Sequence, residues 1–274
     1  MTTRKIIEIV EAVYGKDLSA YSANFLRKSL NFRSREISSG DLEAYGQYLE
    51  KFNLQELEKL IASLTISYTM FFRNSIDISL LEGYILPELL NLKINHNSHS
   101  VRIWSVGCSS GPEAYTLTMI ADKVACERNH KIPIMVFGTD VSEQALVKAR
   151  AGIYELSDVQ NVKLSYVNSC FLQDSSRFVV NEEIRKMVDF SSGDIISPWF
   201  HSPAAGIFAD FDLVSCCNLM IYYTNEIQQM ILEKLYKSLN TNGYLVVGES
   251  ETSVVEKFNK FRKVYPCGNI FIKE

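Results

Sequence analysis

The sequence predicts two parts: an all-α N-terminal domain and a larger α/β domain in which helices cover both faces of a mainly parallel sheet. Residues 1–75 carry apolar side chains at helical spacing and show no strand pattern. From residue 101 onward, short apolar runs alternate with helical patterns, which is typical of a parallel sheet. A chain of 274 residues has room for both parts, each with its own core.

Four helices are expected in the N-terminal part. Apolar residues recur at helical spacing from Ile6 to Tyr14, and Asp17 is the expected N-cap of a second helix. Asp41 is the expected N-cap of a third helix, and leucines repeat over Leu54–Leu64 in a fourth. A linker helix and a polar connector at 91–100 are expected to occupy residues 76–100.

The α/β domain is expected to span residues 101–274. Its parallel strands are predicted at Val101–Val106, Ile132–Phe137, Met187–Phe190, Phe211–Cys216 and Tyr244–Val247. Its helices are predicted at Glu113–Cys126, Ser142–Ala151 and Asn225–Leu239. Two final strands, predicted at Phe261–Tyr265 and Asn269–Ile272, flank a turn and add an antiparallel edge.

Between Tyr154 and Phe190 the pattern breaks into short alternating pieces. Residues 162–167 and 177–180 resemble strands, and no long helical pattern separates them. We expect a small β subdomain inserted into the α/β domain at about residues 160–188.

Composition excludes several classes of protein. The chain is 47% hydrophobic with a net charge of −4, which argues against a disordered chain, a nucleic-acid coat and a polybasic membrane anchor. No apolar run approaches the ~20 residues that span a bilayer, so we expect a cytoplasmic protein without an integral membrane segment. The 6 cysteines include no CxxC pair and the 4 histidines are scattered, so neither a disulfide scaffold nor a metal site is expected.

The turn after the first strand of the sheet has a composition that suits a ligand site, and a purely structural turn is the alternative. Gly107 lets the chain turn sharply, Gly111 allows close approach of the backbone, and Pro112 suits a first helical turn before Glu113. Ligands of open α/β sheets lie at this end of the strands. The spacing is GxxxG, so neither the dinucleotide fingerprint nor the P-loop is satisfied.

Polar residues also follow the later strands. Asp140, just past the second strand, can accept hydrogen bonds from ribose hydroxyls, or it can cap the next helix. Asp194 can accept a hydrogen bond from an adenine amine, or it can close a turn. Asn218 follows the strand that ends at Cys216, and Tyr222 comes shortly after it. A turn asparagine and a packed tyrosine are the alternative there.

Several of these segments, together with others, resemble one known family. The segments are Thr69–Asn74, Trp104–Tyr115, Thr139–Ser142 with Gly152–Tyr154, Asn218–Tyr223, Asn242–Leu245 and Gly248–Glu251. In this order, and over nearly the whole chain, they are similar to the chemotaxis receptor methyltransferases of the CheR type. The resemblance implies a Rossmann-like S-adenosylmethionine-dependent methyltransferase domain with a small β subdomain, preceded by an all-α domain.

The resemblance also implies an activity and a set of site residues. The enzyme would form methyl esters on glutamate side chains of chemoreceptors and release S-adenosylhomocysteine. Arg73 and Tyr222 would position the incoming carboxylate. The cofactor contacts implied are Thr69 and Arg73 in the cleft, with Ser67 where the family often has Asn, Gly107 in the glycine turn, Glu113 at the methionine part, Asp140 at the ribose, Asp194 and Ile195 near the adenine, and Asn218 and Leu219 near the reacting centre.

Three positions depart from the family pattern. Pro112 replaces an acidic or amide residue, and Cys217 stands where an arginine usually precedes the asparagine. Asp194 stands where asparagine is common, so it can accept a hydrogen bond but cannot donate one. The Cys217 departure removes a charge beside the expected cleft.

Partners follow from the same resemblance and from charge. The segment from Asp17 to Glu36 contains Arg27, Lys28, Arg33 and Arg35 with no acid between them. Such a helix favours docking of the acidic cytoplasmic helices of a chemoreceptor, and a merely solvated basic face is the alternative. The β subdomain would bind a receptor tail.

Two other functions stay open from sequence alone. One is a catalytically silent protein of the same fold that binds S-adenosylmethionine and acts as a regulator or adaptor. The other, more distant, is a nicotinamide-dependent dehydrogenase. The enzyme and the adaptor differ in whether Arg73 and Tyr222 support transfer of a methyl group.

Overall fold

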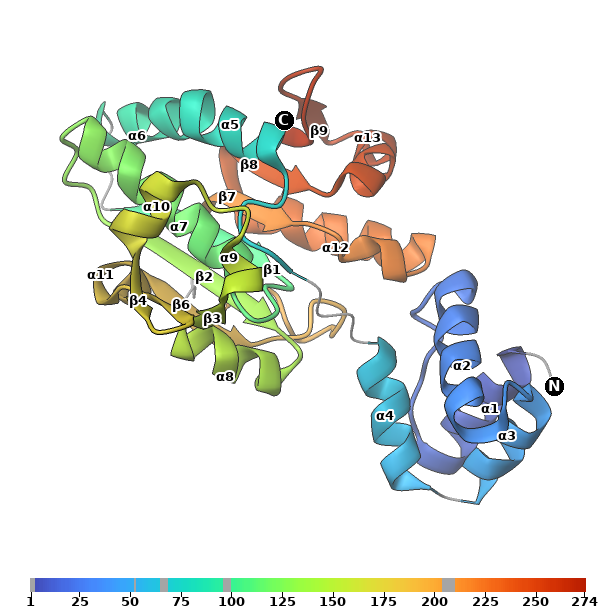
Figure 1. Cartoon of the computed structure of the whole chain (residues 1–274). Coiled ribbons are helices and arrows are strands. Elements are labelled where there is room, and N and C mark those ends of the chain that lie inside the picture. Colours follow the sequence, from blue (N-terminus) through green and yellow to red (C-terminus); the bar gives the residue numbers. More distant parts are fainter. Residues whose placement is uncertain (1–2, 52, 65–68, 96–99, 204–209) are drawn as a thin grey trace. The chain divides into compact units, whose positions relative to one another are not determined.

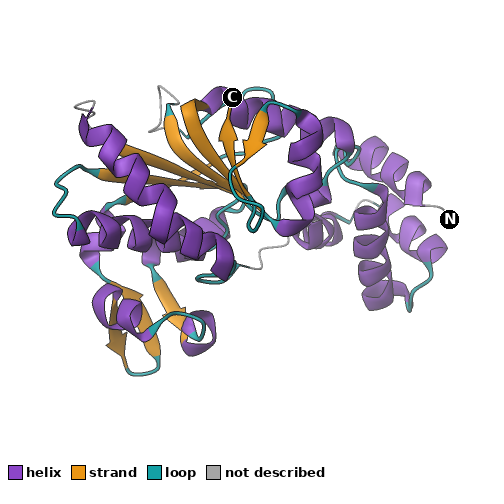
Figure 2. Cartoon of the chain, turned by 90° about the horizontal axis from the view of Figure 1, so that it is seen from above, coloured by secondary structure: helices purple, strands orange, loops and turns teal. Residues whose placement is uncertain are grey.

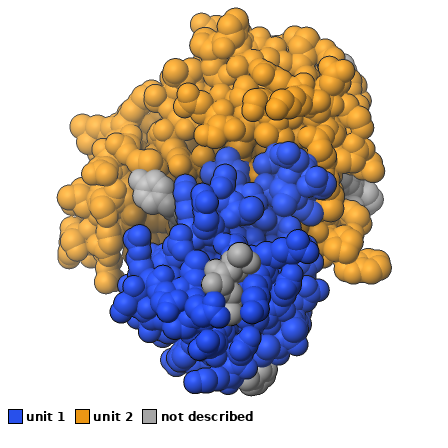
Figure 3. All heavy atoms as spheres, turned by 90° about the vertical axis from the view of Figure 1, so that its right-hand side faces the viewer, with its two compact units in different colours: residues 1–66, 221–228 blue, residues 67–220, 229–274 orange. Residues whose placement is uncertain are grey.

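The structure is a computed structural model that describes residues 3–51, 53–64, 69–95, 100–203 and 210–274. Figure 1 gives the order of the elements along the chain. The chain forms two compact units, coloured in Figure 3: unit 1 contains residues 1–66 and 221–228, and unit 2 contains residues 67–220 and 229–274. The domain bounds expected from the sequence stay a prediction.

Unit 1 is built on four helices around one apolar core. They are α1 (Thr3–Tyr14), α2 (Ala23–Ser38), α3 (Leu42–Glu50) and α4 (Leu54–Leu64). The side chains of Ile6, Val10, Leu30, Tyr45, Leu49 and Leu60 are fully buried in this core.

One of the two N-caps expected in this unit is confirmed. The Asp41 side chain accepts hydrogen bonds from the amides of Glu43 and Ala44 at the start of α3. The expectation for Asp17 is wrong, because α2 begins later, after Ser22. Asp17 instead accepts the Ser19 amide at 2.7 Å in a local turn, which is the competing use of a short acidic side chain.

Residues 221–228, distant in sequence, complete unit 1. The Ser22 amide donates to the Tyr222 carbonyl at 2.8 Å, and the Thr224 amide donates to the Ala20 carbonyl at 2.9 Å. The rings of Tyr21 and Tyr223 stack with centroids 5.3 Å apart.

A buried ion pair ties α2 to α4. Arg33 donates through Nε and Nη2 to the two carboxylate oxygens of Glu56, at 2.9 and 2.7 Å. Tyr45 Oη donates to the same carboxylate at 2.9 Å, and the Glu56 residue is only 2% exposed. These hydrogen bonds raise the pKa of Arg33, and burial raises the pKa of the Tyr45 phenol. Arg33 is therefore engaged inside the unit.

Unit 2 is organised around a seven-stranded sheet with the order β6-β2-β1-β7-β8-β10-β9. The strands are β1 (Val101–Val106), β2 (Ile134–Asp140), β6 (Val188–Ser192), β7 (Phe211–Cys216), β8 (Leu239–Val247), β9 (Phe261–Lys263) and β10 (Ile270–Lys273). The first five are parallel, and β10 runs antiparallel to both β8 and β9. Figure 2 shows these strands as one twisted layer flanked by helices.

The strands predicted for this sheet are all present, but several bounds differ. β2, β6 and β8 are longer than expected, and β9 is shorter. β1 and β7 have the predicted bounds. β2 continues through Asp140, because its pairing with β6 extends to the Asp140–Ser192 register. Backbone pairing thus carries polar residues into the strand where the apolar pattern had stopped. Asp140 is consequently the last residue of β2 and does not lie beyond it.

Helices cover this sheet as the alternating pattern predicts. They include α7 (Pro112–Glu127), α8 (Glu143–Ala151), α12 (Asn225–Ser238) and α13 (Thr252–Phe258). Before β1 come α5 (Ser75–Leu80), a π-helical turn η1 (Leu81–Ile85) and α6 (Leu86–Asn95). The connector expected at 91–100 is therefore wrong for residues 91–95, which extend α6. Leu89 and Leu90 are buried in the last turns before these polar residues.

A separate three-stranded antiparallel sheet lies between α8 and β6 in the chain, with the order β3-β5-β4. Its region contains β3 (Ile153–Glu155), α9 (Leu156–Val159), α10 (Leu164–Cys170), β4 (Phe171–Asp174), β5 (Arg177–Val180) and α11 (Glu182–Lys186). The strand expected at 162–167 is wrong, since α10 occupies most of it. Val162, Tyr166 and Cys170 are buried at a spacing of four, so the buried face has helical period.

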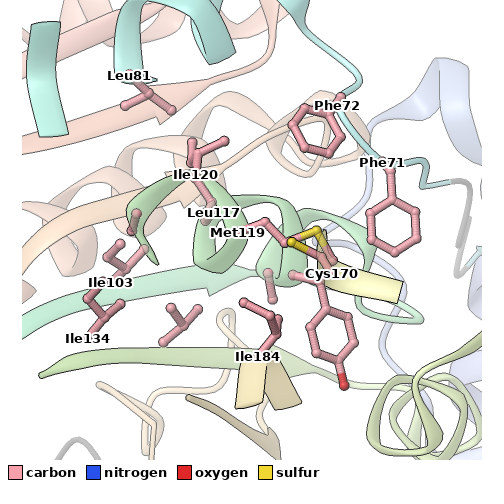
Figure 4. Close-up of a cluster of buried hydrophobic side chains, with 14 of the residues drawn as sticks. Phe71, Phe72, Leu81, Ile103, Leu117, Met119, Ile120, Ile134, Cys170 and Ile184 are labelled. Atoms are coloured by element: carbon pink, nitrogen blue, oxygen red, sulfur yellow. The ribbon is translucent and has the colours of Figure 1, made fainter. Parts of the chain in front are cut away.

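The core of unit 2 joins the large sheet, α7 and the small sheet. Figure 4 shows part of this cluster, with Phe71, Phe72, Met119, Cys170 and Ile184 among the labelled side chains. Among the described helices, none is long and apolar enough to cross a membrane.

Candidate functional site

The candidate site lies at the carboxyl ends of the central parallel strands. The sheet order reverses beside β1, because β2 and β6 lie on one side of it and β7 and β8 on the other. Such a switch point leaves a crevice at the strand ends, where open α/β folds bind ligands. The turns after β1, β2, β6 and β7 carry most of the residues expected from the sequence.

The turn after β1 depends on two glycines. Gly107 has φ +68°, and a Cβ there would lie 3.2 Å from Leu219 Cδ1. Gly111 has φ +97°, and a Cβ there would lie 3.0 Å from the Ala149 Cβ. A larger residue at either position would combine backbone strain with a close contact. Tyr154 supports this turn by donating its hydroxyl to the Ser110 carbonyl at 2.7 Å.

Glu113 lies in the first turn of α7, directly after Pro112 at the start of the helix. Ser105 Oγ donates to Glu113 Oε1 at 2.7 Å, and Ser215 and Cys217 also hydrogen-bond this carboxyl. Ser105 comes from β1 and Ser215 from β7, so the carboxyl lies at the switch point. Burial raises the pKa of Glu113, although these three hydrogen bonds act in the opposite direction.

Asp140 joins the turns after β1 and β2. Its Oδ2 accepts the Ser109 amide at 2.8 Å, and its Oδ1 accepts the Ser142 amide at 2.8 Å. The N-cap of α8 is Ser142, whose hydroxyl accepts the Ala145 amide, so the helix-capping interpretation of Asp140 is wrong. The Val141 amide also hydrogen-bonds this carboxylate, which still has acceptor capacity for a further donor such as a ribose hydroxyl. Burial raises the pKa of Asp140.

The turn after β6, which begins at Gly193, is connected to the end of β2. The Gly193 amide donates to the Asp140 carbonyl at 3.0 Å, which brings the ends of β2 and β6 together. Asp194 Oδ1 accepts the Ile196 amide at 3.0 Å, so the turn-closing role is present. Its adenine role stays a prediction. Lys234 holds this turn by donating to the carbonyls of Ile195 and Ser197, at 2.7 and 2.6 Å.

The turn after β7 contains Asn218 and Leu219. Asn218 has φ +58°, a left-handed conformation that asparagine tolerates better than most residues. Leu219 faces Gly107, so this turn meets the glycine turn after β1. The Cys217 Sγ lies 3.4 Å from Ser215 Oγ, and burial raises the pKa of the thiol, which keeps it neutral beside Glu113.

The segment before α5 is held by its two phenylalanines. Phe71 is fully buried, with its ring 4.8 Å from that of Tyr154, and Phe72 packs 4.8 Å from the ring of Tyr166. The Phe72 amide also donates to Thr116 Oγ1 on α7, at 3.2 Å. Both phenylalanines therefore pack in the core of unit 2.

The same segment carries two predicted site residues. Arg73, which follows the buried Phe72, is exposed, and Thr69 is partly exposed. Ser67, expected beside them, lies outside the described residues.

Tyr222 belongs to unit 1, whereas Arg73 belongs to unit 2. Within unit 1, the Tyr222 ring lies 4.7 Å from the ring of Phe25 and packs against the helical core. The pairing of Arg73 with Tyr222 stays a prediction.

Sequence reasoning missed several residues that shape this site. They are Ser105 and Ser215 beside Glu113, Tyr154 under the glycine turn, Lys234 behind the turn after β6, and Glu251 behind the turn after β7. Glu251 ends one of the segments that carry the family resemblance, and its place three residues after Gly248 is the spacing of a capping box. Ser105 and Tyr154 also lie in segments that carry the resemblance. Ser215 and Lys234 have no such signal, because their partners lie in other elements.

In sequence, the chain is similar to one family of known proteins. Residues 67–266 match the family model described as CheR methyltransferase, SAM binding domain. A chemotaxis protein methyltransferase of Borreliella burgdorferi is 32% identical over 90% of this chain and 87% of its own length. One of Listeria innocua is 28% identical over 89% of this chain and 87% of its own length. Among solved structures, a TehB-like SAM-dependent methyltransferase of Corynebacterium glutamicum aligns with 80% of this chain and 93% of its own, at TM-score 0.38 and 12% identity.

Proposed function

The chain belongs to the CheR methyltransferase family, and from this premise we propose that it transfers a methyl group from S-adenosylmethionine to glutamate side chains of a chemoreceptor. The product on the receptor is a glutamyl methyl ester, and the released product is S-adenosylhomocysteine. The observation that carries the proposal is the cluster of Glu113, Asp140 and two left-handed glycines at the switch point. The family match supports an enzyme over a catalytically silent adaptor.

The described residues fit the cofactor. The half-buried Glu113 carboxyl suits the ammonium of the methionine part, and Asp140 has acceptor capacity left for ribose hydroxyls. Gly107 and Gly111 let the turn proposed to lie beside the nucleoside adopt its left-handed backbone and pack closely against Leu219 and Ala149. Asp194, Ile195, Asn218 and Leu219 are proposed for the adenine side and the reacting centre, with Thr69 and Arg73 closing the site.

The chemistry asks little of acids and bases. Bound S-adenosylmethionine supplies an electrophilic methyl group on a sulfonium. A glutamate side chain, with an ordinary pKa of about 4.3, is already ionised at neutral pH and needs no general base. The protein therefore has to orient the carboxylate and exclude water from it. We assign this orientation to Arg73, through a charge-assisted hydrogen bond to one oxygen, and to the Tyr222 hydroxyl.

The receptor is proposed to dock on α2. Arg27, Lys28 and Arg35 are exposed on this helix, and Phe32 is 59% exposed among them. Exposed bases around an apolar side chain suit an acidic helical partner. Arg33 is removed from this set, because it is paired with Glu56. The docking surface is thus Arg27, Lys28, Phe32 and Arg35.

The small β sheet offers a second place for the receptor. β4 is an edge strand of that sheet, and Leu172 on it is 64% exposed. An edge strand can pair with an extended peptide, so a receptor tail is the proposed occupant. A cytoplasmic location, where the receptor helices lie, is part of the same proposal.

Direct detection of the ester tests the proposed function. Incubation with S-adenosylmethionine and a receptor cytoplasmic fragment is expected to add one methyl group to glutamyl peptides, seen by mass spectrometry. Mild base should remove the group as methanol, because it is an ester. Tight cofactor binding without any methylated glutamate, in the fragment or in membranes of the source organism, would instead favour the adaptor.

Cofactor affinity is expected to fall as the pH is lowered. Since burial raises the pKa of Glu113, its carboxyl takes up a proton at a higher pH than an ordinary glutamate does. The neutral carboxyl cannot pair with the ammonium of the ligand, so the Kd for S-adenosylhomocysteine should rise as the pH is lowered from neutral, and at a higher pH than an ordinary glutamate would cause. Calorimetric titration at several pH values measures this.

Two variants make the pH experiment specific. Glu113→Gln should bind weakly and lose the part of the pH dependence that Glu113 contributes, while Asp140, whose pKa burial also raises, still contributes its own part. Glu127→Gln, at the exposed far end of α7, should follow the wild-type curve. A wild-type Kd that stays constant over this pH range would show that Glu113 does not hold the ammonium.

A further inference from the structure

Glu251 is a buried carboxylate directly behind the turn that carries Asn218 and Leu219. It ends a short 3-10 turn, η4 (Glu249–Glu251), that follows β8, and it is 0% exposed. Its Oε1 accepts the amides of Leu219 and Met220 at 2.8 and 2.7 Å. Its Oε2 accepts the amides of Asn218 and Gly248 at 2.7 and 2.8 Å.

These hydrogen bonds collect three consecutive amides of one turn on a single side chain. The amides of residues 218–220 lie at the start of a 3-10 helix, η3 (Met220–Tyr222), where the helix itself supplies no partner for them. An amide buried without a partner is costly, so the carboxylate compensates for all three at once. It also stabilises the left-handed backbone of Asn218.

The packing leaves this side chain little freedom. A Cβ on Gly248 would lie 2.7 Å from Glu251 Oε2 and 3.0 Å from Asn218 Nδ2. On the other side of the turn, Leu219 lies against Gly107. Glu251 is therefore connected through Leu219 to the contact between the turn after β7 and the glycine turn after β1.

We propose that Glu251 is a positioning residue, which sets cofactor affinity by fixing the backbone of Asn218 and Leu219 from behind. The inference rests on the proposed function in assigning those two residues to the cofactor. It is distinct from a general contribution to stability, because it requires a change in cofactor binding by the folded protein. Glu113, by contrast, is assigned a direct contact with the ligand.

The test is the full-length Glu251→Gln variant. A carboxamide has one acceptor oxygen, so in either orientation its amide nitrogen faces two N–H donors. We expect the Kd for S-adenosylhomocysteine, measured by calorimetry, to rise about 10- to 100-fold. The KM for S-adenosylmethionine should rise by a similar factor, while kcat at saturating cofactor changes less.

The matched control is Glu249→Gln, an exposed glutamate in the same turn, which should bind like the wild type. Gly248→Ala is the second variant, because it keeps the Glu251 charge and displaces its carboxylate. If circular dichroism shows that Glu251→Gln does not fold, Gly248→Ala replaces it in the test. The Kd of Gly248→Ala for S-adenosylhomocysteine should rise as well.

A folded Glu251→Gln or Gly248→Ala protein that binds S-adenosylhomocysteine within about 2-fold of the wild type overturns the proposal, even if its melting temperature is lower. Failure of the proposed function has a different signature. In that case the wild type would bind S-adenosylhomocysteine and the variants would bind it less tightly, yet no glutamate would be methylated.

Discussion

Arg73→Ala is expected to lower kcat/KM for methyl transfer by about 100- to 1000-fold, because it removes the group assigned to orient the incoming carboxylate. The side chain is exposed, whereas the preceding Phe71 and Phe72 are buried and hold the segment. Loss of the guanidinium should therefore leave the fold intact. Transfer of labelled methyl to a receptor fragment measures the rate, and thermal unfolding checks stability.

Three comparisons sharpen the Arg73 experiment. Arg73→Lys keeps the charge but not the fork of donors, so it should recover only part of the rate. Arg128→Ala, an exposed arginine at the far end of α7, should be indistinguishable from the wild type. Calorimetry with S-adenosylhomocysteine separates a cofactor effect from a carboxylate effect. If Arg73→Ala keeps the wild-type kcat/KM, Arg73 does not orient the incoming carboxylate.

Arg33→Ala is expected to destabilise the protein by about 3–5 kcal/mol, because it leaves the buried Glu56 carboxylate without its charged partner. The effect should appear as an early unfolding transition in urea for the full-length chain. The neighbouring Lys28→Ala removes an exposed charge and should change stability by no more than about 0.5 kcal/mol.

The same pair of variants separates docking from folding. Lys28→Ala should raise the KM for the receptor fragment while the urea transition stays in place. The double variant Arg33→Met/Glu56→Gln should recover part of the stability lost in Arg33→Ala, since no buried charge is then unpaired. If Arg33→Ala unfolds like the wild type and raises the receptor KM, Arg33 belongs to the docking surface after all.

Local patterns in the sequence predicted much of the fold correctly. The apolar runs Val101–Val106 and Phe211–Cys216 are strands with those bounds, and Asp41 caps α3 as expected. These features depend on neighbours within a few residues. The errors have the opposite character: Asp140 extends β2 through pairing with β6, and Tyr166 lies in a helix whose buried face contacts distant aromatic residues.

The candidate site also contains features that the sequence predicts and features that only the structure shows. Glycine turns, an acid at a strand end and the order of the motifs are visible in the chain itself, so the sequence alone was enough to name Gly107, Glu113, Asp140 and Asn218. It could not separate Arg33 from the exposed bases of α2, because its partner Glu56 is on another helix. The support of the Asn218 turn by Glu251 likewise joins residues 33 positions apart in the chain.

The sequence by itself determined the family, the alternation of strands and helices, and the residue types that the proposed binding of S-adenosylmethionine requires. Only the tertiary structure decided which charges are available and which are already paired, and which buried groups hold the site from behind. The physical reason is that propensity and periodicity act over a few residues, whereas burial, desolvation and hydrogen bonding to a charge depend on what other segments place beside it.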